Sequence, residues 1–479
     1  MWAKKTKIIA TIWPVTESEE AIVSLYEAGV NVIRFNFSHA NYTNAKLIKW
    51  RIEKLNKEWK TNLSTLLDTK WPEIRTWDLK EKITFERWDL IKIFVNLSLF
   101  TDDGKSLFCD YLYLIEDFNI WDIIEIDSGL LRAKVVNKND NFLEAETMNS
   151  AIIWSRRHIN LPGKKLKLPG ITPKDKEDVL FAIENDFDFI AQSFVRSKEN
   201  VMQLRELLDN NNWVWIKIIS KIENSEWVEN LSEIIEVSDW IMVARWDLGI
   251  EVPIERLPIY QKEMVSKCLG SWKFVIIATH LLESMIENSF PTRAEISDIY
   301  NSVMQKADCL MLSGETAMWK YSIEAASMMK NVIIEAEKSK TYNHYDFLNL
   351  WLNKRNIEKK QLIKSAIFMS EELDVDAILV FTKTWLLARF GAAFRPNKPV
   401  YAFTGNKNSF KYMNILFWIS PFLLDNWSFN HKENVVNSIN FLLETGSLTK
   451  ENRVIVITDI QKDNKEIPAL EIITIKDFF

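Results

Sequence analysis

Two short segments carry charged side chains in a pattern that suits metal-assisted chemistry. An apolar run over residues 216–222 ends in Lys221-Ile222-Glu223, and a run over 240–244 continues into Arg245-Trp246-Asp247. Alternate side chains of a strand share a face, so Lys221 and Glu223 point the same way. Carboxylates on neighbouring strands suit a hard divalent cation such as Mg²⁺. A lysine beside them could stabilise charge on a phosphoryl group or an enolate; the plainer alternative is a buried Lys–Glu pair.

A second group of polar residues follows two earlier apolar runs. Asn36, Ser38, Asp68 and Thr69 offer amide, hydroxyl and carboxylate oxygens with one formal charge among them. Such a set suits a monovalent cation, and the adjacent Arg34 suits a phosphate group. Spacing alone favours a simpler role, in which Asn36 and Ser38 are turn residues and Asp68 caps a helix.

Both groups stand at the ends of segments that predict strands alternating with helices. The expected strands are 7–12, 31–37, 63–68, 187–195, 214–223, 240–244, 274–278 and 309–312. Alternating strands and helices predict a parallel sheet covered by helices. Eight such units predict an α/β fold of the (β/α)8 or TIM-barrel type, in which chemistry takes place at the carboxyl ends of the strands.

Two further regions depart from this rhythm. Between the third and fourth units the pattern changes to short strands and turn clusters without a convincing helix, which predicts a small β-barrel lid domain over 71–169. A charged connection later leads into a separate C-terminal α/β domain over 343–479, with strands expected at 377–381, 400–403 and 454–458. The barrel is therefore expected to comprise residues 1–70 and 170–342.

Composition excludes several classes of protein. The net charge is −6 and like charges form no block, so a nucleic-acid partner or a membrane-surface role has no electrostatic basis. No apolar segment approaches the ~18 residues that a membrane span requires. The three cysteines lack the spacing of a zinc site or a disulfide framework, which favours a reducing, cytoplasmic location.

The longest motifs resemble those of pyruvate kinase. The matching segments are 6–14, 31–39, 66–75, 191–196, 221–224, 238–249, 278–285, 291–295 and 311–317, and 395–399 resembles the C domain of that family. They follow the family's order along the whole barrel, and the insert falls where the family has its mobile lid. The resemblance implies phosphoryl transfer from phosphoenolpyruvate to ADP, giving pyruvate and ATP in glycolysis, and a homotetramer.

The resemblance also implies roles for individual residues. The catalytic residues would be Lys221 at the transferring phosphoryl group, Thr279 near the enolate carbon and Arg34 on the phosphate, with Trp246 and Asp247 also contacting substrate. Glu223 and Asp247 would hold Mg²⁺ or Mn²⁺. The implied potassium ligands are Asn36, Ser38, Asp68 and Thr69, with Glu73 typical of the K⁺-dependent branch. The nucleotide would be bound by Asn36, His39, Arg75 and Arg157. Ser313 and Glu315 could join a proton relay.

Glycine and tryptophan counts are abnormal. The chain has only 11 glycines but 20 tryptophans in 479 residues, and the two counts together match the ordinary glycine usage of about 7%. This chain has tryptophan where the pyruvate kinase family has glycine at nine positions: 13, 71, 77, 154, 227, 240, 246, 319 and 385. This pattern supports the hypothesis that the natural gene uses UGA for glycine.

Two other functions stay open on the sequence. A barrel lyase or aldolase using Mg²⁺-enolate chemistry would explain Lys221, Glu223 and Asp247, but not Arg75, His39 or the lid. A catalytically impaired, effector-binding relative would follow if Trp246 were genuine and blocked the pocket.

Overall fold

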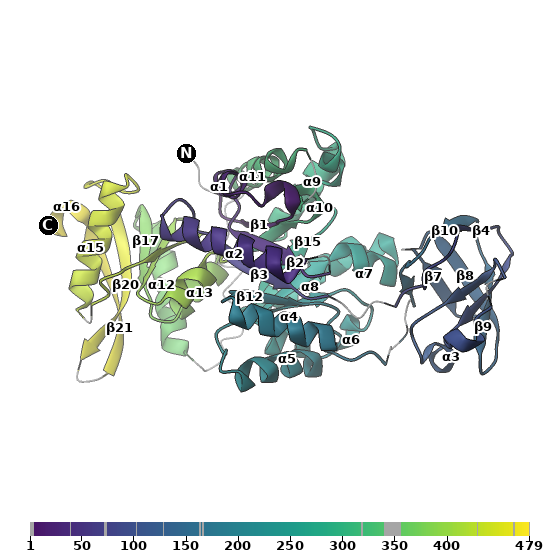
Figure 1. The fold of residues 1–479 in the computed structure, drawn as a ribbon. Helices are drawn as coiled ribbons and strands as arrows, with labels where there is room; N and C mark the ends of the chain where they lie inside the picture. Colours follow the sequence, from purple (N-terminus) through teal and green to yellow (C-terminus); the bar gives the residue numbers. More distant parts are fainter. Residues whose placement is uncertain are drawn as a thin grey trace.

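The computed structural model has three parts, each with its own sheet (Figure 1). It describes residues 4–38, 40–70, 74–101, 103–127, 129–161, 164, 167–317, 320–339, 356–428, 430–462 and 465–478.

Eight parallel strands close into a barrel in the central part. Their order around the barrel is β1-β16-β15-β14-β13-β12-β3-β2. Their bounds are β1 (Lys7–Thr11), β2 (Val32–Asn36), β3 (Ser64–Asp68), β12 (Phe189–Gln192), β13 (Lys217–Ile222), β14 (Trp240–Ala244), β15 (Phe274–Ala278) and β16 (Cys309–Leu312). These strands are nearly continuous apolar runs, as expected where helices cover one side of the sheet and side chains fill the other.

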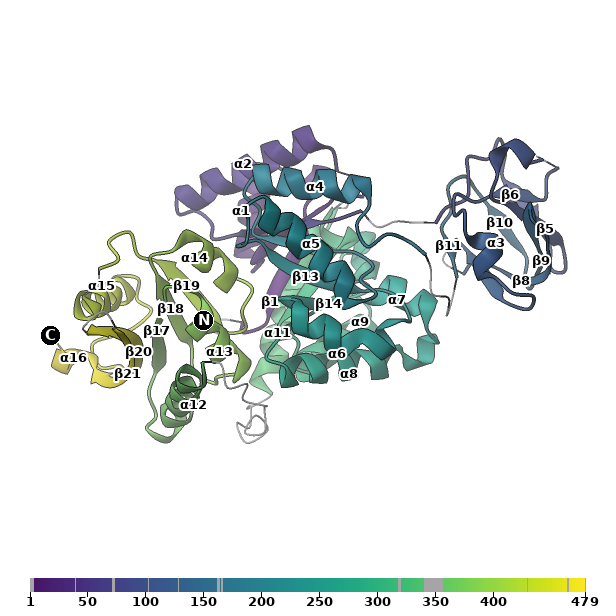
Figure 2. The ribbon, with the colours of Figure 1, turned by 90° about the horizontal axis from the view of Figure 1, so that it is seen from below.

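Helices surround this barrel on its outer side (Figure 2). They are α1 (Glu19–Glu27), α2 (Tyr42–Lys57), α4 (Pro173–Glu184), α5 (Lys198–Asn210), α6 (Trp227–Val237), α7 (Arg245–Glu251), α8 (Leu257–Gly270), α9 (Arg293–Met304), α10 (Gly314–Ala317) and α11 (Ser322–Lys338), with 3-10 turns η1 (Pro14–Thr16), η3 (Ile254–Arg256) and η4 (Glu283–Ile286). Capping boxes at Thr172 and Thr292 start α4 and α9, because a threonine oxygen satisfies an otherwise unpaired helical N–H group.

The insert is β-rich and stands apart from the barrel on the right in Figure 1. Its six-stranded sheet has the order β11-β7-β8-β9-β5-β6, and β10 pairs with β4. The elements are β4 (Ile83–Phe85), β5 (Leu90–Phe94), η2 (Leu97–Leu99), β6 (Ser106–Phe108), α3 (Leu114–Asp117), β7 (Ile123–Ile126), β8 (Leu131–Lys138), β9 (Phe142–Thr147), β10 (Ala151–Ile153) and β11 (Ile159–Asn160). The one-turn helix α3 was not expected from the sequence.

The C-terminal part is a five-stranded sheet with helices. Its strand order is β19-β18-β17-β20-β21, with β20 and β21 antiparallel. The elements are α12 (Ile357–Glu372), β17 (Ala377–Phe381), α13 (Leu386–Ala393), β18 (Val400–Thr404), α14 (Lys407–Met413), β19 (Ile419–Leu423), α15 (His431–Glu444), β20 (Arg453–Lys462), β21 (Lys465–Thr474) and α16 (Ile475–Phe478). In Figures 1 and 2 it lies on the side of the barrel opposite the insert.

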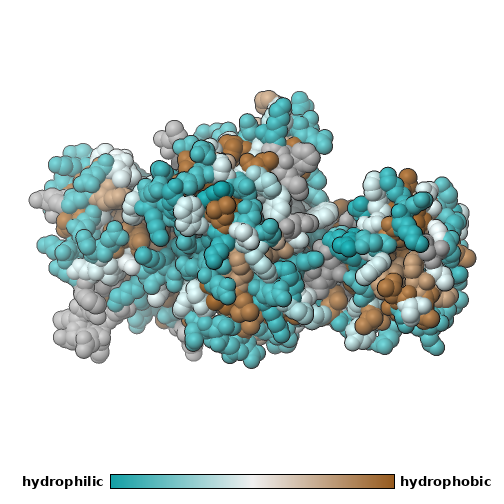
Figure 3. Space-filling view, viewed as in Figure 1, coloured by the Kyte–Doolittle hydropathy of each residue, from teal (hydrophilic) through white to brown (hydrophobic). Residues whose placement is uncertain are grey.

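The expected fold class is therefore confirmed: a TIM barrel with an inserted β-rich domain and a C-terminal α/β domain. The domain boundaries at 70/71, 169/170 and 342/343 stay predictions. No helix among the described residues is both long enough and apolar enough to cross a membrane, and hydrophilic and hydrophobic side chains are mixed over the face in Figure 3.

Candidate active site

Lys221 lies at the centre of a buried network of charges. It comes near the carboxyl end of β13, where its Nζ is 2.8 Å from Glu223 Oε1 and 3.1 Å from Asp68 Oδ1. Burial alone would lower the pKa of Lys221. The carboxylates of Asp68 and Glu223 outweigh burial and raise this pKa above its usual range. Lys221 therefore stays charged at any physiological pH.

Asp247 completes the acidic side of this network. It lies in the first turn of α7, directly after β14. Burial and the nearby Glu223 carboxylate raise the pKa of Asp247 to about 8. Two acids that share a buried position repel each other when both are ionised, and a bound divalent cation removes that repulsion. The oxygen donors of Glu223 and Asp247 fit a hard cation completed by water and substrate. Within the described ranges no cluster of three or more His, Cys, Asp or Glu side chains suits a metal.

Arg34 closes the other side of the network. It belongs to β2, and its Nε lies 2.7 Å from Asp68 Oδ2 while its Nη1 donates to Thr11 Oγ1 at 2.8 Å. Burial would raise the pKa of Asp68, but Lys221 and Arg34 lower it below the usual value. Asp68 is thus an ionised anchor that holds two cations at the mouth of the barrel.

A cavity of ≈ 570 Å³ opens beside Arg34, whereas Lys221, Glu223, Asp68 and Asp247 are not among its described lining residues. Arg34, Asn36, Trp246, Thr279, Ser313 and Glu315 contribute to its wall. These side chains come from the ends of β2, β14, β15 and β16, the strand ends at which TIM-barrel chemistry takes place. The cavity is large enough for a small phosphorylated substrate.

Thr279 and Trp246 meet at this cavity. The backbone N–H of Trp246 donates to Thr279 Oγ1 at 2.9 Å, and Thr279 Oγ1 donates to the carbonyl of Ala278 at 2.6 Å. The indole of Trp246 is 46% exposed and forms part of the cavity wall.

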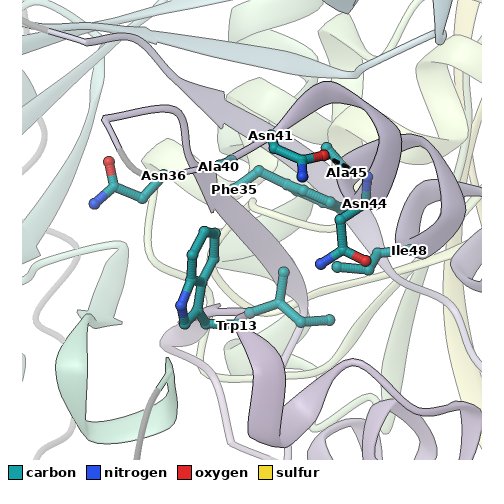
Figure 4. Close-up of a pocket in the computed structure, with 9 residues that line it drawn as sticks. Trp13, Phe35, Asn36, Ala40, Asn41, Asn44, Ala45 and Ile48 are labelled. Carbon is teal, nitrogen blue, oxygen red and sulfur yellow. Dashed lines mark hydrogen bonds between the residues drawn. The ribbon is translucent and has the colours of Figure 1, made fainter.

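The four residues expected to bind a monovalent cation lie on two adjacent strand ends. Asn36 and Asp68 are direct partners in the β2–β3 ladder, and the Ser38 N–H donates to Asn36 Oδ1 at 3.2 Å. Thr69 Oγ1 accepts the N–H of Ser193 at 3.2 Å. In Figure 4, Asn36 lies on one side of Trp13, and Asn41 and Asn44 lie on the other, around a small pocket.

The residues expected to bind nucleotide are not all gathered at the cavity. Arg75 and Arg157 belong to the insert: Arg75 Nη1 donates to the Arg156 carbonyl at 2.8 Å, and Arg157 Nη1 is 3.5 Å from Asp127 Oδ1. Neither contributes to the described wall of the cavity. His39 and Glu73 lie outside the described residues.

Sequence reasoning missed Ser193 and the contacts of Arg245. Ser193 Oγ donates to the Thr69 carbonyl at 2.9 Å and accepts a bond from Lys221 Nζ at 2.9 Å. Its position near the end of the strand expected over 187–195 was the available signal. Arg245 donates to three consecutive carbonyls from Ala278 to His280. An arginine two residues before a candidate metal ligand was the signal available in the sequence.

Known proteins are similar to this chain over most of its length. Residues 3–326 match the family model described as pyruvate kinase, barrel domain, and residues 360–469 match pyruvate kinase, alpha/beta domain. Pyruvate kinase of Bacillus licheniformis is 37% identical, with 95% of this chain and 77% of the relative covered. Plastidial pyruvate kinase 2 of Arabidopsis thaliana is 35% identical, with 95% and 79% covered. The crystal structure of a pyruvate kinase from Cryptosporidium parvum superposes with a TM-score of 0.92 at 32% identity, covering 98% and 96% of the two chains. Matches to both domain models, together with relatives that align along nearly the whole chain, show that this chain belongs to the pyruvate kinase family.

Proposed function

We propose that this chain transfers the phosphoryl group of phosphoenolpyruvate to ADP and releases pyruvate and ATP. The observation that carries the proposal is the buried Lys221 ammonium, held between Asp68 and Glu223 and close to Asp247. Phosphoryl transfer depends chiefly on positioning and charge neutralisation, which this network supplies. A lyase or aldolase would not account for the match to both pyruvate kinase domains.

The side chains divide the work of the reaction. Arg34 binds the substrate phosphate, and Lys221 stabilises negative charge on the phosphoryl group as it moves to ADP. Thr279 lies beside the enolate carbon that must gain a proton. Family membership implies metal dependence, and Glu223 and Asp247 are the residues that would hold Mg²⁺ or Mn²⁺. When bound, that ion supplies a Lewis acid for phosphate and enolate oxygens.

We propose K⁺ as a second cofactor, held by Asn36, Ser38, Asp68 and Thr69. The pairing of Asn36 with Asp68 across β2 and β3 supports this site, because it sets amide and carboxylate groups side by side. Their mixed oxygen ligands carry one negative charge, which suits a monovalent ion placed next to a phosphate.

The insert would contribute residues to the ADP-binding site. Arg75 and Arg157 lie on this insert, away from the cavity wall. Closure of the insert over the barrel would carry both guanidinium groups toward the nucleotide and exclude water from the reacting phosphate. His39 and Asn36 are proposed as nucleotide contacts on the barrel side.

We further propose that many of the tryptophans are glycine in the natural protein, read from UGA. Among the described residues, five tryptophans have left-handed backbones: Trp59 (φ 58°), Trp88 (77°), Trp121 (82°), Trp272 (59°) and Trp418 (57°). A bulky residue with positive φ is an outlier, whereas glycine adopts that conformation without a Cβ clash. Of the nine positions expected from the family, the seven that the structure describes have other backbone conformations, and Trp71 and Trp319 lie outside the described residues.

Buried indole N–H groups without an acceptor support the same substitution at two of those seven positions. Trp227 and Trp240 are fully buried, and the indole N–H of each lacks a hydrogen-bond acceptor among the described residues. Leaving such a donor buried and unpaired costs about 1–3 kcal/mol. Glycine has no side chain, so it would leave no unpaired indole donor buried at these two positions.

Peptide mass spectrometry of the protein purified from its native host tests the recoding directly. We expect peptides with glycine at positions 59, 246 and 272, each lighter than the tryptophan form by the mass of the indole side chain. Tryptophan at position 246 in the native protein would reject recoding at the cavity and revive the impaired, effector-binding alternative.

A homotetramer in the cytoplasm is proposed by analogy with the family. The three cysteines, Cys109, Cys268 and Cys309, are all buried and unpaired, which agrees with a reducing compartment. Light scattering coupled to size exclusion would measure the subunit number, and a monomer at assay concentration would reject the tetramer.

An assay coupled to lactate dehydrogenase tests the proposed reaction. It is run with phosphoenolpyruvate, ADP and Mg²⁺, with and without K⁺, on the literal sequence and on a sequence in which only the tryptophans proposed to be read from UGA are replaced by glycine. We expect K⁺-stimulated pyruvate formation by the glycine form. Absence of ATP and pyruvate from a folded glycine form would reject the kinase function.

A further inference from the structure

Two consecutive residues at the cavity hold an unusual backbone conformation. Thr279 has a φ of 67° and His280 a φ of 54°, directly after the end of β15. A left-handed conformation is unfavourable for a β-branched residue such as threonine and persists only where the surroundings enforce it. The turn from Ala278 to His280 must therefore be held by contacts from outside the turn.

Arg245 supplies those contacts from the neighbouring strand end. Its Nε is 3.3 Å from the Ala278 carbonyl oxygen and 3.2 Å from that of Thr279, and its Nη2 donates to the His280 carbonyl oxygen at 3.2 Å. One guanidinium thus donates to three successive carbonyls from separate nitrogens of a rigid planar fork, whereas an ammonium offers its three donors from a single atom.

The guanidinium is itself fixed from behind. Arg245 is only 7% exposed, and its Nη1 donates to Asp298 Oδ2 at 2.6 Å and to Gln261 Oε1 at 3.4 Å. These partners come from α9 and α8. Packing and charge pairing therefore leave the side chain little freedom to release the turn.

The next residue ties the same turn on its cavity side. The N–H of Trp246 donates to Thr279 Oγ1 at 2.9 Å, so residues 245 and 246 hold the backbone and the hydroxyl of the turn together. The position of the Thr279 hydroxyl is consequently set by the first turn of α7.

We infer that Arg245 is a positioning residue that holds Thr279 in place for protonation of the enolate. The inference rests on the proposed function. In that step the enolate electron pair forms a new C–H bond with a proton from solvent, and the C–O bond becomes the pyruvate carbonyl. Displacement of Thr279 would slow this step more than phosphoryl transfer, which depends on Lys221 and the acidic pair.

The test compares the two half-reactions in Arg245→Lys, which keeps the charge but loses the fork. Exchange of the pyruvate methyl protons in D₂O, followed by NMR with Mg²⁺, K⁺ and ATP present, reports enolate protonation. ATP formation from phosphoenolpyruvate, coupled through hexokinase, reports phosphoryl transfer. We expect methyl exchange to fall at least tenfold, and ATP formation and the KM for phosphoenolpyruvate to change less than threefold.

A matched control uses another arginine–aspartate pair of the barrel. Arg205 Nη2 donates to Asp239 Oδ2 at 2.6 Å near the opposite ends of β13 and β14, so Arg205→Lys should leave the ratio of exchange to ATP formation unchanged. Asp298→Asn should lower the ratio in the same direction as Arg245→Lys, by a smaller factor.

The results distinguish a failure of the positioning role of Arg245 from a failure of the proposed function. An unchanged ratio in Arg245→Lys, or an equal fall of both reactions with a lowered Tm, would overturn the positioning role. A wild-type protein that shows neither reaction would overturn the proposed function and this inference with it.

Discussion

The charge state of Lys221 decides what this residue can do. Burial disfavours an ammonium, but the carboxylates of Asp68 and Glu223 outweigh burial and raise the pKa of Lys221 above its usual range. A group that holds its proton so firmly is a poor proton donor near neutral pH. In the proposed mechanism Lys221 would act by fixed charge, and the proton that completes pyruvate would arrive from the side of Thr279.

Replacement of Lys221 by methionine tests this electrostatic role. Lys221→Met removes the positive charge but keeps a side chain of similar length, so we expect kcat to fall by about 10²–10³, as for the loss of one group that stabilises the transition state. The coupled assay with phosphoenolpyruvate and ADP measures kcat, and circular dichroism checks the fold.

Lys217 offers a matched control on the same strand. It begins β13, at the end remote from the cavity, and it packs against the Tyr412 ring at 5.1 Å. Lys217→Met should keep kcat within about threefold of the wild type. Retention of nearly full activity by Lys221→Met would contradict the role given to that ammonium.

The sequence predicted the placement of a site residue well only where that placement depends on neighbouring residues of the same strand. Strand alternation alone places Lys221 and Glu223 on one face, and the 2.8 Å contact confirms it. Ser193 gave no such signal, because a serine after a strand has many roles. Arg75 depends on where a separate domain lies, which no local pattern contains.

At the scale of elements, the ends of helices show where glycine is needed. Helix α2 ends with Trp59 in the left-handed position, where its N–H bonds the Asn56 carbonyl and the Lys60 N–H bonds the Leu55 carbonyl. Helix α8 ends in the same way at Trp272. This pair of bonds defines a Schellman motif, whose left-handed position is usually glycine. In this chain Gly29 and Gly446 occupy that position after α1 and α15.

Glycine substitutions at Trp59, just after α2, and at Trp50, within α2, compare a position proposed to be glycine with one where tryptophan fits the helix. Trp59→Gly should raise the free energy of unfolding by about 1 kcal/mol, because it removes a Cβ from a left-handed backbone. Trp50→Gly, in the middle of the same helix and 55% exposed, should lower that free energy by about 0.5–1 kcal/mol. Denaturant unfolding of both variants measures the two changes, and destabilisation by Trp59→Gly would count against recoding at that position.

Strand prediction succeeded in the barrel and failed at the edges of the C-terminal sheet. The barrel strands are apolar runs without proline. The two edge strands that sequence analysis omitted, β19 and β21, contain Pro421 and Pro468. Proline argues against a central strand because it cannot donate to the ladder, yet an edge strand tolerates it. Knowing which strand lies at an edge requires the assembled sheet.

At the scale of the whole molecule, one described contact between the insert and the barrel involves Glu251. Glu251, at the end of α7, forms a side-chain hydrogen bond with Asn160 of β11 in the insert, and both side chains are buried. Glu125 of the insert and Glu226 of the barrel lie close enough to repel it. Burial and these carboxylates raise the pKa of Glu251 to about 7, which places its titration within the physiological range.

This titration predicts a pH-dependent junction between the insert and the barrel. A carboxyl whose pKa is higher in the folded protein stabilises the fold fully below its ordinary value of 4.5 and loses that contribution as the pH rises through about 7. Glu251→Gln keeps the hydrogen bond to Asn160 without the charge, so its Tm should exceed that of the wild type above pH 7 and approach it at acid pH. Thermal unfolding at a series of pH values measures this difference, and amide exchange of β11, compared between the two proteins at each pH, locates it. Glu255→Gln, an exposed carboxylate one turn further on, should leave the pH profile unchanged. Parallel profiles for the wild type and Glu251→Gln would show that Glu251 does not control the junction.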